Sequence, residues 1–240
     1  LNGFNETISN LVFNSQGGGT AGNGPIVLTG AGTLTLTGGI TSTSLDDVRA
    51  VPALLGLLSL ASSTTVTVDP VTNAAVNGNN QLGLTINSNI LSSGTILKAG
   101  TGALQFGGVS YATNTFGFTD GSSGVIVLGA NSNYGSTTIN LGYSGNILDM
   151  RGQTNLQVGT ITGVAGSIIK NFSVATAGTL VTGDSTGGTF AGTFNSDYFT
   201  AGSTGGVLNV TKIGSGNWVL TGDSSAGISG TGGFTQAGSG

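Results

Sequence analysis

Few side chains in this sequence could carry out chemistry, and neither histidine nor cysteine is among them. The 240 residues include five lysines and arginines and nine aspartates and glutamates. The absence of cysteine and histidine removes thiolate and imidazole metal ligands, and it removes the Ser–His and Cys–His forms of nucleophilic catalysis. Any reaction would depend on carboxylate, ammonium, guanidinium, hydroxyl or amide groups, and we expect neither a catalytic residue nor a metal nor a cofactor.

The strongest catalytic candidate is Asp149-Met150-Arg151, which places a carboxylate and a guanidinium two residues apart on one face of a strand. A polysaccharide lyase or hydrolase could use an acidic and a basic group in this way. Glycosidases need two positioned carboxylates, however, so a surface ion pair of small energetic value is the favoured interpretation. The next candidate is Asp46 and Asp47 with Arg49, which we interpret as a helix start with a salt bridge.

Two copies of Thr-Gly-Asp-Ser, around Asp184 and Asp223, are candidate cation sites. Gly-Asp turns could bind calcium if several aspartates converged. The calcium-binding repeat Gly-Gly-x-Gly-x-Asp is absent, and Gly-Asp is also an ordinary turn at the end of a strand, which is the reading we favour. Trp218 and four tyrosines could instead form a contact surface for glycans or proteins: Tyr111, Tyr134, Tyr143 and Tyr198.

The charge distribution argues against two classes of partner. The formal net charge is −4, and the five basic residues, which form no run, are Arg49, Lys98, Arg151, Lys170 and Lys212. Nucleic-acid binding and polybasic membrane anchoring both need clustered basic residues, so we expect neither. The longest apolar stretch, Ala50 to Ala61, is too short for a membrane span, which needs about 20 residues.

The composition predicts an all-β fold, and the strands of this fold would position any functional group. Charged residues make up 6% and hydrophobic residues 37% of the chain, the reverse of a disordered sequence. Apolar runs rich in β-branched residues are bounded by Gly, Asn, Asp or Ser, as strands are. These runs are Ile8–Phe13, Ile26–Leu28, Thr33–Thr37, Thr64–Val68, Leu82–Ile86, Thr95–Lys98, Val125–Leu128, Ser136–Leu141, Thr179–Thr182, Val207–Thr211 and Asn217–Thr221.

Internal similarity favours a solenoid over a sandwich or a barrel. The segments 28–38, 98–108 and 212–222 share the frame G-x-G-x-[LW]-x-[LF]-x-G. The first glycine pair permits a tight corner, and the two large apolar residues, two apart, would point inward. We therefore predict a single right-handed parallel β-helix over 1–240, with about 20 to 25 residues per coil and on the order of 10 coils. A Leu- and Ala-rich stretch at about 44–60 indicates a short helical or irregular insertion.

The same frame resembles the autotransporter-associated β-strand repeat of bacterial passenger domains. The best match is Asn209 to Gly222, and Leu128 to Gly142 resembles the second half of that repeat. The opening, Leu1 to Leu11, is similar to a segment common in such proteins. The first copy departs from the pattern, because Leu28 stands where the family tends to have lysine. The resemblance implies an extracellular location, either secreted or attached to the bacterial outer membrane, and the translocator barrel expected of such proteins would lie outside this sequence.

Three functions are open at this point. The favoured one is a non-catalytic structural or adhesive segment of a cell-surface protein, not an enzyme, whose partners are further solenoid coils and surface glycans or proteins. The second is a self-assembling filament subunit that packs end to end, because uncapped solenoid ends expose strand edges. The third is a polysaccharide-active β-helix enzyme. A complete reading frame would discriminate among them, since we interpret this chain as a processed or partial segment.

The repeats also predict which side chains face inward. We expect the two large apolar residues of each copy to be buried on parallel strands and the residue between them to point outward. The inward set is Leu34, Leu36, Leu104, Phe106, Trp218 and Leu220, and the outward set is Thr35, Gln105 and Val219.

Overall fold

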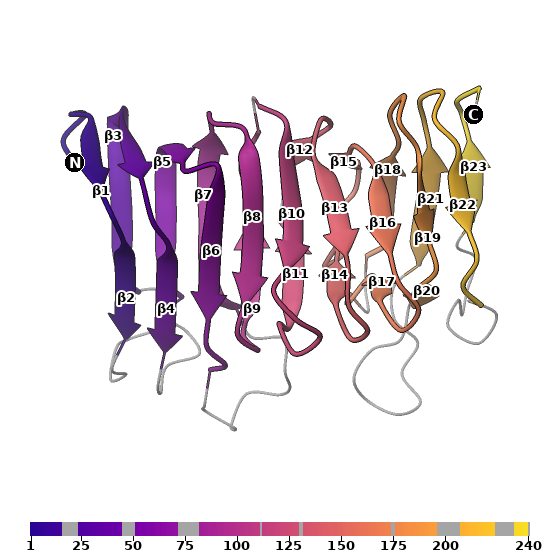
Figure 1. The fold of residues 1–240 in the computed structure, drawn as a ribbon, viewed down its shortest axis with the longest axis horizontal. Helices are drawn as coiled ribbons and strands as arrows, with labels where there is room; N and C mark the ends of the chain where they lie inside the picture. Colours follow the sequence, from indigo (N-terminus) through magenta and orange to yellow (C-terminus); the bar gives the residue numbers. More distant parts are fainter. Residues whose placement is uncertain are drawn as a thin grey trace.

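The chain forms an elongated rod of stacked coils, with the two termini at opposite ends (Figure 1). The computed structural model describes residues 1–15, 24–44, 51–71, 82–110, 112–129, 132–173, 176–195, 207–223 and 233–239. Within these residues every regular element is a β-strand, and every strand pairing is parallel. The predicted fold, a right-handed parallel β-helix, is confirmed.

Three parallel sheets form the walls of the rod. Sheet A contains, in spatial order, β1 (Glu6–Ile8), β3 (Ile26–Leu36), β5 (Ala53–Leu60), β7 (Leu82–Ile90), β9 (Ala103–Phe106), β11 (Val125–Leu128), β14 (Ile147–Asp149), β17 (Ile168–Lys170) and β20 (Thr193–Asn195). Sheet B contains β2 (Leu11–Ser15), β4 (Ile40–Ser44), β6 (Ser63–Val68), β8 (Gly94–Ala99), β10 (Asn114–Phe118), β13 (Thr138–Leu141), β16 (Ile161–Gly163), β19 (Gly188–Phe190) and β22 (Trp218–Leu220). Sheet C contains β12 (Asn133–Tyr134), β15 (Leu156–Val158), β18 (Gly178–Thr182), β21 (Leu208–Lys212) and β23 (Phe234–Gln236).

The strand registers give the length of each coil. Tyr134 pairs with Val158 and Val158 with Thr182, so these turns take 24 residues each. Leu58 pairs with Ile90, a turn of 32 residues, which exceeds the predicted 20 to 25. Sheets A and B have nine strands each, close to the predicted number of coils. At the usual strand spacing, nine strands span about 40 Å along the rod.

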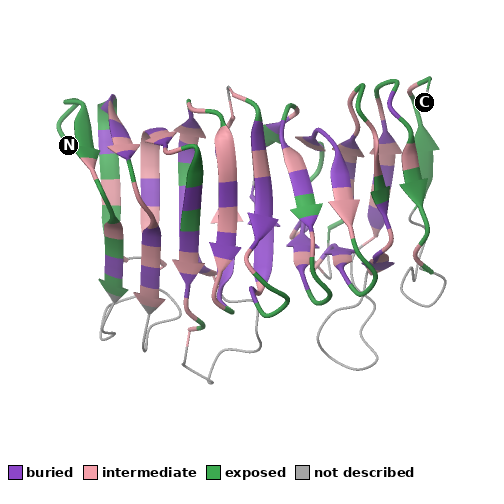
Figure 2. Cartoon of the chain, viewed as in Figure 1, coloured by how far each residue is buried: buried purple, intermediate pink, exposed green. Residues whose placement is uncertain are grey.

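The hydrophobic core runs along the inside of the rod, where side chains from the three sheets meet. Buried and less buried residues alternate along the strands, and the strands at both ends of the rod are the most exposed (Figure 2). Leu34, Leu36, Leu104 and Phe106 are buried, as predicted. The alternation follows from the two-residue period of a strand, which sends successive side chains to opposite faces.

The facing prediction is wrong for the last repeat. Leu220 is 41% exposed, although we expected it inside, while Val219 is 49% exposed as expected. Trp218 is only partly buried and packs against the core. The physical reason is position: β22 is the last strand of sheet B among the described residues, which therefore provide no further strand of this sheet to cover Leu220.

The three copies of the repeat lie on three different sides of the rod. Leu104 lies in β9 of sheet A and Trp218 in β22 of sheet B. Leu34 lies in β3, which is counted with sheet A but has a register shift between Leu28 and Thr33. Beyond that shift Leu34 pairs with Leu58, which pairs with Ile90, and this ladder leads through bridges at Val109 and Ser110 to β12 of sheet C. The frame is therefore a local corner-and-strand unit that any side of the coil can use, and it does not mark one recurring side.

The insertion expected at about 44–60 is not a helix over its second half. Ala53–Leu60 forms β5, which pairs with β3 on one side and β7 on the other. Residues 45–50 lie outside the described residues. The run Ile8–Phe13, expected as one strand, is broken at Ser9 and Asn10, so its two parts belong to β1 in sheet A and β2 in sheet B.

The outer side of sheet A carries a second, smaller apolar cluster that the sequence did not indicate. Ile126 and Leu128 of β11 belong to the main core, whereas Val125 and Val127 on the opposite face are also buried. The rest of this cluster, on neighbouring strands of the same sheet, consists of Ala103, Leu82 and Ile147. This wall of the rod is therefore covered on both faces, and the polar residues that follow the cluster along the sheet are buried with it.

Candidate functional site

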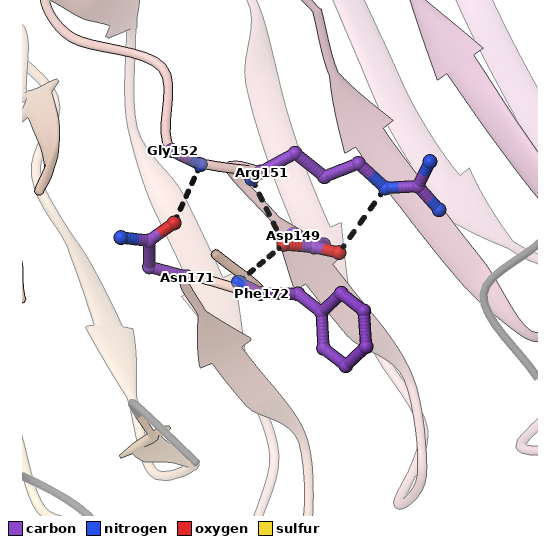
Figure 3. Close-up of polar contacts among 5 residues, drawn as sticks. All are labelled: Asp149, Arg151, Gly152, Asn171 and Phe172. Carbon is purple, nitrogen blue, oxygen red and sulfur yellow. Dashed lines mark hydrogen bonds and ion pairs between the residues drawn. The ribbon is translucent and has the colours of Figure 1, made fainter. Parts of the chain in front are cut away.

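The carboxylate of Asp149 is buried in the wall of the rod, at the end of β14 (Figure 3). Its Oδ1 accepts hydrogen bonds from the backbone N–H of Arg151 and from that of Phe172, each at 3.0 Å. Phe172 follows β17, the next strand along sheet A. The carboxylate thus ties the corner after β14 to the corresponding corner of the following coil.

Asp149 and Arg151 form the ion pair expected from the sequence, but it is not on the surface. Arg151 Nε lies 3.6 Å from Asp149 Oδ2, which is longer than a hydrogen bond, and the two side chains are 24% and 0% exposed. Burial lowers the pKa of the Arg151 guanidinium, while Asp149 opposes that shift. Arg151 also has a positive φ of 44°, which marks the sharp corner that directs its side chain back toward the carboxylate.

Lys170, which the sequence analysis did not single out, joins this site from the next coil. Lys170 pairs in register with Asp149, its side chain is 8% exposed, and its Nζ lies 5.0 Å from the centroid of the Phe172 ring. Burial lowers the pKa of Lys170; Asp149 raises it and Arg151 lowers it further. The signal was present in the sequence, because Asn-Ile-Leu-Asp at 146–149 and Ser-Ile-Ile-Lys at 167–170 occupy equivalent places on successive coils.

Asn171 completes the polar cluster by joining three segments of backbone. Its Oδ1 accepts a hydrogen bond of 2.6 Å from the N–H of Gly152 (Figure 3). Its Nδ2 donates to the carbonyl oxygens of Thr176 and Val207, at 2.9 and 3.0 Å. The side-chain amide therefore supplies hydrogen bonds to backbone groups that lose their strand partners where the chain turns away from the sheet, which is a structural role.

The first Thr-Gly-Asp-Ser motif forms a turn. Asp184 Oδ1 accepts hydrogen bonds from Thr160 Oγ1 at 2.7 Å and from the N–H groups of Thr186 and Gly187, at 2.7 and 3.2 Å. Burial opposes ionisation here, but these hydrogen bonds outweigh it, and the pKa of Asp184 is lowered. Asp223, of the second motif, is exposed. In the described ranges, no three acidic side chains gather as a cation site would require.

The remaining candidates lie in the core, at the surface or among the undescribed residues. Tyr134 is fully buried, its hydroxyl accepts a hydrogen bond from the Gly108 N–H, and its pKa is raised by burial. Tyr143 is exposed, and Trp218 donates its Nε1–H to the Ile161 carbonyl at 2.8 Å. Five candidates lie outside the described residues: Asp46, Asp47, Arg49, Tyr111 and Tyr198.

The lysine of the repeat frame closes a corner from the inside. Lys98 is 0% exposed, and its Nζ donates to the carbonyl oxygens of Ala99, Gly100 and Ser123 at 3.0, 2.6 and 2.7 Å. Three acceptors match the three N–H donors of an ammonium group. Lys98 occupies an inward position in sheet B between Val66 and Phe118, so its charge is enclosed by apolar neighbours.

Lys212 repeats this arrangement on another side of the rod. Its Nζ donates to the carbonyl oxygens of Ile213 and Gly214, at 2.8 and 3.0 Å. Gly100 and Gly214 have φ angles of 72° and 73°, and a Cβ at Gly100 would overlap the carbonyl oxygen of Val68 on the preceding coil. In the sequence Lys-x-Gly, the lysine therefore stabilises a corner of the coil by binding the carbonyl groups that the turn leaves unpaired.

Lys98 predicts a pH dependence of stability. Burial lowers its pKa from 10.5 to about 7, against the opposing effects of Asp120 and Asp69. Between these two values the unfolded chain binds a proton that the folded chain does not, so the free energy of unfolding rises with pH, by up to about 1.4 kcal/mol per pH unit. Lys98→Met should remove this contribution, and urea unfolding at several pH values between about 7 and 10.5 measures it.

A neighbouring substitution provides the control for that measurement. Leu97→Met, on the outer face of the same strand, changes no titratable group and should leave the slope as it is in the unmodified chain. Equal slopes in the Lys98→Met variant and in the unmodified chain would show that Lys98 keeps its ordinary pKa in the fold.

Two further observations concern the chain as a whole. The described part of the chain contains no helical segment of the length and hydropathy that a membrane crossing requires. No family model, no curated protein and no solved structure matches the sequence or the fold.

Proposed function

We propose that this chain is a non-catalytic structural or adhesive segment of a secreted or surface-attached bacterial protein, of the autotransporter passenger kind. The observation that carries the proposal is the continuous parallel stack of coils, which makes a rod about 40 Å long from a repeating unit. Such a rod can reach farther from a cell surface as coils are added to it. Its repeated frame resembles the autotransporter-associated β-strand repeat of passenger domains. Its partners would be further solenoid coils and surface glycans or proteins.

The use of the polar groups supports a structural role. The Oδ1 atoms of Asp149, Asn171 and Asp184 accept hydrogen bonds from backbone N–H groups, and Lys98 donates its hydrogen bonds to backbone carbonyl groups. Each of these side chains joins neighbouring coils or closes a corner. Groups committed in this way hold the rod together, and they are poorly placed to bind a substrate.

The outer face of sheet B supports an adhesive role. Ser63 pairs with Thr95, Thr95 with Thr115, and Thr115 with Thr138, so four hydroxyl groups form one column along the rod. These residues alternate with core residues such as Phe116, which places them outside. Hydroxyl groups both donate and accept hydrogen bonds, as glycans and polar protein surfaces require.

Surface labelling of intact cells of the producing organism tests the location. An antibody against the chain should stain unpermeabilised cells or detect the chain in the medium. External protease should remove the cell-bound signal. Detection only after permeabilisation would contradict the proposal. Turnover of a panel of polysaccharides tests the enzymatic alternative: product formation that Asp149→Asn abolishes would establish an enzyme.

A filament subunit is the second candidate, because strand edges are unpaired at both ends of the described part of the rod. Among the described strands, β1 and β2 at one end, and β20, β22 and β23 at the other, each pair with a neighbour on one side only. Phe4, Val12, Val219 and Phe234 are exposed near these edges. Open edges pair with like edges. Light scattering should show concentration-dependent association of the isolated chain, whereas a monomer that persists at high concentration would argue against end-to-end packing.

A further inference from the structure

The outer side of sheet A carries a carboxylate, an amine and a carboxamide on three successive strands. Asp149 of β14 pairs in register with Lys170 of β17, and Lys170 pairs in register with Asn195 of β20. Residues in register on adjacent parallel strands project from the same face of the sheet and lie about 4.8 Å apart. The amine therefore has the acid on one side and the carboxamide on the other.

The surroundings of this column favour a reactive amine. Asp149 is fully buried and Lys170 nearly so, beside the ring of Phe172. Burial lowers the pKa of Lys170, which increases the share of the neutral, nucleophilic amine. Asp149 holds its two backbone donors with Oδ1, whereas Oδ2 accepts no hydrogen bond in the described structure and faces Arg151 Nε at 3.6 Å. Oδ2 is thus the oxygen left to exchange protons.

The other two lysines lack this combination. Lys98 pairs in register with Val66 and Phe118, which offer neither an acid nor an amide. Lys212 pairs with Thr182 and Gln236, so it has a carboxamide on one side and no carboxylate on the other. Lys170 alone among the three lysines lies between both groups needed for an amide exchange.

We propose that Lys170 and Asn195 form an intramolecular isopeptide bond, with Asp149 as the proton carrier. Lys170 gives one proton to Asp149, and the neutral Nζ attacks Cγ of Asn195. The Nζ–Cγ bond forms, the Cγ–Nδ2 bond breaks, and Asp149 passes protons from Nζ to the departing nitrogen. The ammonium group of lysine and the carboxamide thereby become a secondary amide and one ammonium ion, Asp149 returns to its carboxylate form, and no oxidant or reductant is consumed.

Such a bond would stabilise a rod that has no cysteine and therefore no disulfide bond. It would join β17 to β20 directly and close a covalent ring around one coil, which restricts the unfolded chain as a disulfide does. It would also remove a buried positive charge, because the amide of Lys170 no longer titrates. The inference does not depend on the function proposed above.

The intact mass of the purified, folded chain tests the proposal. The bond predicts a mass lower than that of the sequence by one ammonia molecule. Trypsin should then fail to cleave after Lys170 and should release the peptide from Gly152 to Lys212 whole, also one ammonia short. Lys170→Arg, Asn195→Ala and Asp149→Asn should each restore the full mass, and the last keeps an Oδ1 acceptor for the two backbone donors.

Lys212→Arg is the matched control, since it alters a buried lysine outside the column and should keep the loss of ammonia. Circular dichroism establishes that each sample is folded, and if Asn195→Ala does not fold, Lys170→Arg decides. The full mass in the folded unmodified chain would overturn the proposal. A loss of ammonia that persists in Lys170→Arg would overturn it too, because it would indicate a succinimide at an asparagine.

Discussion

Replacing Phe116 by alanine should cost about 3–5 kcal/mol of unfolding free energy. Phe116 is fully buried, and its ring stacks on that of Phe106 with centroids 4.3 Å apart. It also meets the ring of Tyr134 edge-on, at 5.2 Å. The three rings come from sheets B, A and C respectively, so Phe116→Ala opens a cavity where all three walls of the rod meet.

Chemical denaturation of the variant and the unmodified chain measures this effect. Phe4→Ala is the matched control: the same atoms are removed from a side chain that is 70% exposed, so the change should stay within about 0.5 kcal/mol. Equal losses in the two variants would mean that the core position of Phe116 is no more important than a surface position, which contradicts the packing described here.

The parallel stack could be predicted from the sequence because its signals are local. Alternation at Leu34 and Leu36 and glycines at the corners each depend on neighbouring residues only. The side of the rod that each repeat occupies could not be predicted. It depends on the summed lengths of the coils between copies, and those lengths vary from 20 residues between Thr95 and Thr115 to 32 between Leu58 and Ile90.

The error at 53–60 has a physical cause. Leu54, Leu58 and Leu60 of β5 are buried in the core, but Leu55 and Leu57 on the opposite face are apolar as well. An apolar run on both faces of a strand cannot be distinguished from a buried helix by periodicity. Pairing with β3 and β7 decides the outcome, and propensity alone does not contain that information.

Only part of the candidate site could be predicted from the sequence. Asp149 and Arg151 are near neighbours in the chain, so their ion pair was expected and is present. Its burial and the approach of Lys170 depend on the register between β14 and β17, which brings residues 21 positions apart into one column. Aligning the two strand ends by their shared Ile-[LI]-charged pattern would have placed Lys170 there.

Asp149→Ala should be the most damaging change at this site, at about 3–5 kcal/mol. The substitution leaves the N–H groups of Arg151 and Phe172 without their acceptor inside the wall of the rod. It also removes the carboxylate that lies 3.6 Å from the Arg151 guanidinium. Buried donors without an acceptor carry a desolvation cost, and here two of them arise from the loss of one side chain.

Asp120→Ala separates this effect from the general loss of an aspartate. Asp120 also accepts hydrogen bonds through its Oδ1, from the N–H and hydroxyl of Ser122 and from the hydroxyl of Ser123, but it lies in an exposed turn. Water can replace the carboxylate there, so the loss of unfolding free energy should be much smaller than for Asp149→Ala. Urea unfolding of both variants gives the comparison. If Asp149→Ala lowers the free energy of unfolding no more than Asp120→Ala does, then water reaches the Asp149 carboxylate. The hydrogen bonds of Asp149 to the corners after β14 and β17 would then not hold the two coils together.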